Sequence, residues 1–442
     1  MKRLLCLILI VPMLFSAAAC TVRTQDPQPQ SLSENPVENT TAPDPSVDPP
    51  IELTDPVQPI CEPMSELPEV NGYADFSNLL SAALLSGTQN RNLSPISVYL
   101  ALAMVTEGAE GDTRTELLRL LGCKDLAELR GVCAVMLEAL SFDGEGSTLE
   151  LSNSLWMADR INDVPVTFRD AYLAALADTY RSEANTVSFG SQSAREQIAA
   201  WITEHTHEKI RISPDALIFD PSTLAVLINA IYLKDGWSET FDPEITAPDT
   251  FSAYTGEMTV DYMHRFDRNA VVRRGDGWIA YRVRMNRVGY VTFVLPDEGI
   301  ELSRLLGSPD AIDTLLHAGT EQKYDVSLMI PKFKFQDRIE LADVLEALGL
   351  RLSFSPAADF SGMSDLPCRI DRVLQESYIG VDEYGVEAAA YTMIQMRTTA
   401  FNPTQLEKID FHLTRPFFYA IESNDGTVLF IGTVTNPSPS AP

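Results

Sequence analysis

Hydrophobic positions alternate between helical and strand spacing from about residue 70 to residue 437. Apolar residues at helical spacing predict helices at 73–86, 94–109, 170–179, 194–209 and 339–348. In the second of these, Ser94 is a good N-cap and Pro95 lies in the first turn. Runs rich in β-branched and aromatic residues predict strands at 224–233, 289–295, 326–330, 377–381, 417–421 and 428–434. The last two strands flank Ser-Asn-Asp-Gly, which is a hairpin signal. With no internal repeat, the pattern predicts one large mixed α+β domain over residues 70–438.

The first 69 residues follow another pattern. Lys2 and Arg3 precede an apolar run at 4–15, and small residues then lead to Cys20, as in a secretory signal. The run of small residues before Cys20 resembles the lipobox of bacterial lipoproteins. We therefore expect residues 1–20 to be a lipoprotein-type signal peptide with lipid attached to Cys20. A plain signal peptide, cleaved after one of the alanines, is the alternative.

Residues 21–69 are rich in proline and acidic side chains. They hold eleven Pro, ten Asp or Glu and one Arg, a composition that cannot bury enough apolar surface to offset the entropy of ordering. We expect a disordered tether that holds the domain away from a membrane. The protein is then secreted, extracytoplasmic and anchored only through lipid on Cys20. No later apolar run approaches the roughly 18 residues of a spanning helix.

The net charge and the lack of known catalytic motifs narrow the range of possible functions. The formal net charge of -29 argues against nucleic acid or an anionic membrane surface as a partner. The chain has no GxSxG, GxxxxGK[ST] or GxGxxG motif, and its one histidine cluster, His205 with His207, has the wrong spacing for a zinc helix. We expect no catalytic residue, no metal and no cofactor, and thus no enzyme. Cys123 and Cys133 are either bridged or free.

The stretch at 382–405 has an unusual alternation. One set of alternate residues carries no charge: Val386, Ala388, Ala390, Thr392, Ile394, Met396 and Thr398. The other set contains both charges, Glu387 and Arg397. Because the side chains of a strand alternate between its two faces, this is the pattern of a half-buried strand. The small residues at 388–390 let such a strand enter a sheet without overpacking, and Gly385 offers the backbone freedom of a hinge.

Several motifs resemble those of the serpin family, in family order and over about residues 70–437. They are NLSPISV at 92–98, EGAEGDT at 107–113, LINAIYLK at 227–234, Trp237, FDP at 241–243, LPD at 295–297, IPKF at 330–333, ADFSGM at 358–363, RPFF at 415–418 and residues 431–437. The resemblance implies a serpin fold with three β-sheets, about nine helices and an exposed reactive loop near the C-terminus. It also implies a suicide inhibitor, in which a protease cleaves the loop and the loop inserts into the central sheet.

The resemblance assigns roles to single residues. The loop hinge matches an inhibitory pattern at Glu383, Gly385, Val386, Glu387, Ala388, Ala389, Ala390 and Thr392. Counting the usual seventeen residues from Glu383 puts the reactive bond at Thr399–Ala400, with Arg397 or Met396 as alternatives. Ser94, Ser97 and Asn229 match the shutter under the sheet, and Trp237 matches the breach where the loop first enters. Gln375 stands where the family has a shutter histidine, so an altered hydrogen-bond network is expected.

The sequence thus predicts a monomeric inhibitor that forms a covalent complex with a serine protease. The small residues Thr399 and Ala400 favour an elastase-like or subtilisin-like target. Two alternatives stay open: a non-inhibitory binding protein with the serpin fold, and a cross-class inhibitor of papain-like cysteine proteases.

Overall fold

The computed structural model describes residues 70–144, 146–220, 222–387 and 406–437. These residues form nine α-helices and three hydrogen-bonded sheets, which confirms the predicted α+β class. The helices are α1 Tyr73–Leu84, α2 Pro95–Gly108, α3 Gly111–Leu120, α4 Leu126–Ala139, α5 Asp170–Tyr180, α6 Gln192–His205, α7 Leu302–Leu305, α8 Ala311–His317 and α9 Ala342–Ala347. Within the described ranges, no helix is both long and apolar enough to cross a bilayer.

The largest sheet has nine strands, in the order β1-β18-β17-β11-β10-β9-β12-β16, with β8 paired to β9. Its strands are β1 Arg91–Leu93, β8 Ala247–Ala253, β9 Gly256–Gly275, β10 Trp278–Arg284, β11 Gly289–Pro296, β12 Thr320–Pro331, β16 Lys408–His412, β17 Phe417–Ser423 and β18 Val428–Val434. A separate two-stranded sheet joins β4 Arg160–Ile161 to β5 Val164–Pro165.

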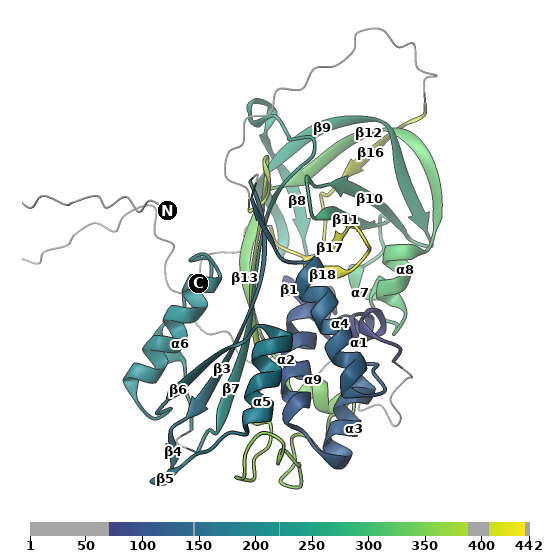
Figure 1. Ribbon diagram of the computed structural model, residues 1–442. Coiled ribbons are helices and arrows are strands. Elements are labelled where there is room, and N and C mark those ends of the chain that lie inside the picture. The colour runs from purple at the N-terminus through teal and green to yellow at the C-terminus, as the bar shows by residue number, and fades with distance from the viewer. Residues whose placement is uncertain (1–69, 145, 221, 388–405, 438–442) are drawn as a thin grey trace, which may run out of the picture. The chain divides into compact units, whose positions relative to one another are not determined.

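The seven-stranded sheet holds the loop hinge. Its order is β13-β14-β15-β7-β3-β2, with β6 paired to β3. Its strands are β2 Phe142–Gly144, β3 Ser147–Ala158, β6 Glu183–Val187, β7 Ala225–Gly236, β13 Phe333–Glu340, β14 Leu374–Asp382 and β15 Gly385–Val386. In Figure 1, α6 lies on one side of these strands and α2 and α5 lie on the other. The face toward α2 is the inner face and the face toward α6 is the outer face.

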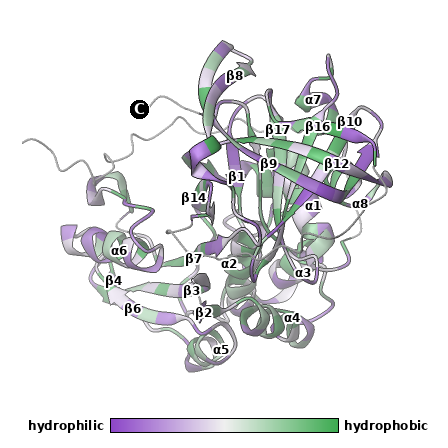
Figure 2. Cartoon of the chain, turned by 90° about the horizontal axis from the view of Figure 1, so that it is seen from above, coloured by the Kyte–Doolittle hydropathy of each residue, from purple (hydrophilic) through white to green (hydrophobic). Residues whose placement is uncertain are grey.

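The core explains this layering. Helix α2 is buried almost all round, with Tyr99, Leu100 and Ala103 fully enclosed, as expected of a helix that is apolar on every side. Figure 2 shows that α2, which lies beside β7 and β3, is mainly hydrophobic, whereas the turns at the periphery of the molecule are more hydrophilic. A smaller cluster, which includes Trp156, Phe189 and Trp201, packs α6 against the outer face.

All five predicted helices are present, and two of them differ from the prediction by more than two residues at one end. The first ends at His205 rather than residue 209, because His207 and Glu208 adopt positive φ angles of 48° and 65° and Thr206 closes a turn with its Oγ1. The second begins at Ala342 rather than residue 339, because Ile339 belongs to β13, where it pairs with β14. The periodicity also missed α3, α4 and the strands β3, β9 and β10.

The predicted alternatives for the cysteines are resolved. Cys123 and Cys133 are both buried and free, and the Cys123 Sγ lies 3.4 Å from the Tyr99 hydroxyl. Burial raises the pKa of both thiols, so they behave as small apolar side chains.

Candidate functional site

The site begins at the hairpin between β14 and β15. The Asp382 Oδ1 accepts hydrogen bonds from the Tyr384 N at 2.8 Å and the Gly385 N at 3.3 Å, which turns the chain back on itself. A Cβ at Gly385 would lie 2.2 Å from the Asp235 carbonyl oxygen. Only glycine therefore lets β15 approach β7 this closely.

Strand β15 pairs with both of its neighbours. On one side Val386 lies opposite Val381 and Gly385 opposite Asp382. On the other side the same two residues lie opposite Asp235 and Gly236. The Val386 side chain is 3% exposed, so the start of the loop already occupies the seven-stranded sheet.

Trp237 anchors the top of this region, which we call the breach. Its side chain is fully buried, and its Nε1 donates to the Asp382 carbonyl oxygen at 2.8 Å. Its backbone N donates to the Tyr384 carbonyl oxygen at 2.9 Å. The sequence placed Trp237 here only by resemblance; the structure brings it into contact with the hinge.

Glu383 ties the same hairpin to the residue that follows β12 and to the residue that precedes β8. Its carboxylate lies 2.9 Å from the Lys332 Nζ and accepts from the Thr246 hydroxyl at 2.8 Å. Burial alone would raise the pKa of Glu383, but the hydrogen bonds from Lys332, Thr246 and its own backbone outweigh burial, and the pKa is lowered. The carboxylate is therefore held in its charged form.

Buried Asp235 joins the end of β7 to two other segments. It accepts hydrogen bonds from the Ser147 hydroxyl at 2.5 Å and from the backbone N atoms of Arg287 and Val288 at 2.9 and 2.8 Å. Sequence reasoning missed Asp235, because a lone aspartate in a strand gives no local signal. Its three donors compensate its burial.

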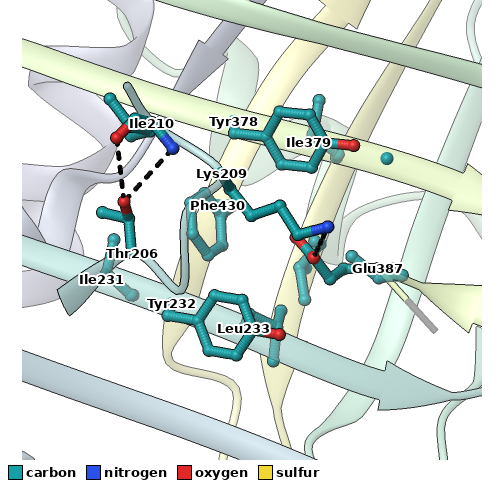
Figure 3. A pocket seen from close by; sticks show the side chains of 13 residues that line it. Thr206, Lys209, Ile210, Ile231, Tyr232, Leu233, Tyr378, Ile379, Glu387 and Phe430 are labelled. Carbon is teal, nitrogen blue, oxygen red and sulfur yellow. Dashed lines mark hydrogen bonds and ion pairs between the residues drawn. The ribbon is translucent and has the colours of Figure 1, made fainter. Parts of the chain in front are cut away.

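Below β15 the sheet is incomplete. Within the described residues, β14 pairs only with β13 and β15, and β7 pairs only with β15 and β3. We call the space between residues 225–234 of β7 and 374–380 of β14 the gap. A pocket opens at its upper end, lined by Tyr232 and Leu233 from β7, Tyr378 and Ile379 from β14, and the last hinge residues (Figure 3).

The predicted shutter residues form two separate groups. Gln375 makes two hydrogen bonds with the backbone of Ser94: its Oε1 accepts from the Ser94 N at 3.1 Å and its Nε2 donates to the Ser94 carbonyl oxygen at 2.7 Å. The Ser97 hydroxyl donates to the Ser94 hydroxyl at 3.1 Å. Gln375 thus makes its described contacts with helix α2 rather than with Asn229.

Asn229 belongs to the second group. Its Nδ2 donates to the Asn153 Oδ1 at 2.8 Å, and the Asn153 Nδ2 donates to the Tyr180 carbonyl oxygen at 2.7 Å. The Asn229 Oδ1 is buried and has no hydrogen-bond partner among the described residues. A buried acceptor without a donor is costly, so this oxygen marks a position where the gap lacks a donor.

Glu387 ends the described part of the hinge. It has a positive φ of 53°, and its backbone N donates to the Gly380 carbonyl oxygen at 2.9 Å. Its side chain is 6% exposed and its carboxylate lies 2.6 Å from the Lys209 Nζ. Burial raises the pKa of Glu387, against the opposing charges of Lys209, Lys234 and His207.

Several predicted residues fall outside the described ranges: Cys20, Ala388, Ala389, Ala390, Thr392, Met396, Arg397, Thr399 and Ala400. Within those ranges, no three His, Cys, Asp or Glu side chains gather as metal ligands.

Known proteins share the family profile and the fold of this chain. Residues 71–437 match the family profile "Serpin (serine protease inhibitor)". An uncharacterized serpin-like protein of Thermococcus kodakarensis is 32% identical over 382 residues, covering 84% of this chain and 86% of the relative. The native-state crystal structure of the thermophilic serpin tengpin superposes with a TM-score of 0.71 at 27% identity, covering 82% and 93%. A thyroxine-binding globulin in complex with thyroxine shares the fold, with a TM-score of 0.69 at 23% identity, covering 82% and 99%.

Proposed function

The chain belongs to the serpin family, and from this premise we propose that it irreversibly inhibits serine endopeptidases, with elastase-like or subtilisin-like enzymes as the favoured targets. Serpins as a class are generally inhibitors rather than enzymes. The observation that carries the proposal is strand β15, two residues that already pair with both walls of the gap.

The pairing of β15 can be continued residue by residue. The next inward-facing residue, Ala388, falls opposite Ile379 of β14 and Leu233 of β7. Both neighbours are large and buried, so a methyl group fits between them where a larger side chain would overpack. Two residues on, Ala390 falls opposite Ser377 and Ile231 in the same way.

The same continuation places Thr392 between Gln375 and Asn229. The hydroxyl of Thr392 supplies a donor at the level of the Asn229 Oδ1, which lacks one among the described residues. Beyond it, Ile394 falls between the apolar side chains of Val373 and Leu227. The polarity of each of these loop residues therefore matches that of the β14 and β7 residues that flank it. This match supports insertion over chance alternation.

The outward-facing set fits as well. Ala389 falls between Tyr232 and Tyr378, the two aromatic rings that line the pocket. A strand inserted over residues 387–398 gains on the order of ten backbone hydrogen bonds at about 1 kcal/mol each. That free energy is large enough to make insertion effectively irreversible.

This free energy of insertion drives the proposed inhibitory reaction. The nucleophile of the protease attacks the carbonyl carbon of Thr399, the peptide bond to Ala400 breaks, and the new amine leaves with Ala400. The carbonyl of Thr399 stays ester-linked to the protease while the freed loop inserts, so the protease is carried along before water can release it. Arg397 and Met396 remain alternative cleavage positions.

A protease panel tests this proposal. The full chain is incubated with pancreatic elastase, subtilisin, trypsin and papain. Denaturing gels then reveal covalent complexes, and mass spectrometry of the released C-terminal peptide locates the cut. We expect a denaturant-resistant complex with elastase or subtilisin. Cleavage without a complex and without a rise in Tm would favour the non-inhibitory alternative, and a complex with papain alone would favour the cross-class one.

We also propose that residues 1–20 direct export and that lipid on Cys20, followed by the tether at 21–69, anchors the protein outside the cytoplasm as a monomer. Radioactive palmitate fed to expressing bacteria should label the wild type but not Cys20→Ser. Equal labelling of both proteins would exclude the anchor.

A further inference from the structure

Residues 206–210, which we call the strap, cross the outer face over the gap. From the strap, the His207 Nε2 lies 3.0 Å from the Glu150 Oε2 on β3, and its ring stacks on Tyr232 of β7 at 4.0 Å. On the far side, the Gln336 Nε2 of β13 donates to the Lys209 carbonyl oxygen. The strap therefore contacts strands on both sides of the gap.

Lys209 reaches from the strap to the hinge. Its side chain passes between Tyr232 and Tyr378 before it meets Glu387 (Figure 3), and its Nζ lies 5.8 Å from the centre of the Tyr378 ring. This is the space into which Ala389 falls when the pairing of β15 is continued. Lys209 thus occupies the next position that an inserting loop needs.

The two partners of this ion pair differ in exposure. The Glu387 side chain is 6% exposed, whereas that of Lys209 is 41% exposed. A buried carboxylate is costly unless it is paired. Loss of the ion pair should therefore displace Glu387 more than it displaces the better-solvated Lys209.

We propose that Lys209 is a positioning residue that holds the hinge at its present depth, with Val386 inside the sheet and the chain stopped at Glu387. The inference rests on the proposed function for its meaning, since hinge depth matters only if the loop inserts. The positive φ of Glu387 belongs to this stop, because an inserted strand requires an extended backbone there.

Hydrogen exchange of the uncleaved full-length protein tests the inference, read on the peptide that contains Val386 and Glu387. Lys209→Met keeps the aliphatic stem and removes the charge. We expect its exchange in this peptide to be faster by about tenfold, because a hydrogen bond to a charged group is lost. Lys209→Arg should restore protection. Arg211→Met is the matched control, since Arg211 directly follows the strap but pairs with Glu208.

A double-mutant cycle separates the ion pair from packing. Glu387→Gln removes the buried charge, so in that background Lys209→Met should change the exchange by less than about twofold. Equal acceleration in both backgrounds, or no acceleration in Lys209→Met alone, would overturn the inference. The measurement needs no protease, so its failure is distinguishable from a failure to form inhibitory complexes.

Discussion

The proposed loop insertion begins at Val386. It is 3% exposed and shares the pocket wall with Leu233, Ile379, Ile421 and Phe430. An arginine at this position would bring a charge into an apolar space. Asp235, which lies opposite on β7, already accepts three hydrogen bonds. We therefore expect Val386→Arg to expel the hinge from the sheet.

The magnitude follows from two costs. Leaving a charge buried without a partner costs about 3–5 kcal/mol, and losing the burial of the valine side chain costs about 1.5–3 kcal/mol. The first cost alone lowers the equilibrium population of the inserted hinge by roughly 10²- to 10⁴-fold. Insertion then loses its race against hydrolysis of the acyl-enzyme, and the inhibitor becomes a substrate.

The assay is the stoichiometry of inhibition with the protease that the panel identifies. We expect the number of inhibitor molecules consumed per enzyme to rise from near one to tens or more, while the rate of loop cleavage stays within about threefold of the wild type. Val386→Asp should behave like Val386→Arg, which excludes rescue by an ion pair with Asp235. Val386→Thr should retain inhibition, and Val135→Arg, on an exposed side chain of α4, is the control for added charge. If Val386→Arg forms denaturant-resistant complexes at the stoichiometry of the wild type, insertion does not begin at this residue.

Two further predictions concern the same gap. Thr392→Val should leave the Tm of the uncleaved protein unchanged but lower the stability of the loop-cleaved form by about 1–2 kcal/mol, because the Asn229 Oδ1 stays without a donor; equal unfolding midpoints for the two cleaved proteins would contradict the continued pairing. Hinge protection should increase as the pH falls through the raised pKa of Glu387 toward the ordinary glutamate value of 4.5. Burial raises the pKa of Glu387, although the positive charges of Lys209, Lys234 and His207 act in the opposite direction. The inserted hinge therefore favours the protonated form of Glu387. The free-energy cost of burying the carboxylate disappears as the pH falls through that raised pKa. Hydrogen exchange corrected for the intrinsic rate measures this, with Tyr232 and Tyr378 as the other titratable groups facing Glu387. The same pH response in Glu387→Gln would show that Glu387 is not the group responsible.

Much of the fold was predictable because its signals are local. The apolar run of α2 behind Ser94 and Pro95, the strands flanking Ser-Asn-Asp-Gly and the period-2 set around Val386 each depend on neighbours within a few residues. The ends of α6 and α9 were predicted wrongly because apolar spacing continued past the point where tertiary contacts took over. At α6, a hydrogen bond from the Thr206 hydroxyl and two positive φ angles end the helix before any change in composition.

The candidate site was predictable only in part. The resemblance named Trp237, Glu383 and the hinge, and the structure adds their contacts, which the sequence could not give. It did not indicate that Gln375 bonds the backbone of Ser94 and leaves Asn229 to Asn153, because a single substitution does not reveal how its neighbours re-pair.

The sequence by itself determined that residues 382–398 alternate between an uncharged set and a charged set, and hence that this stretch suits a strand with one buried face. Only the tertiary structure decided which strands flank Gly385 and Val386 and in what register, because Val386 meets Val381 and Asp235 through pairings between segments far apart in the chain. It also placed Lys209, which the sequence assigned to a helix, on the outer face beside Glu387.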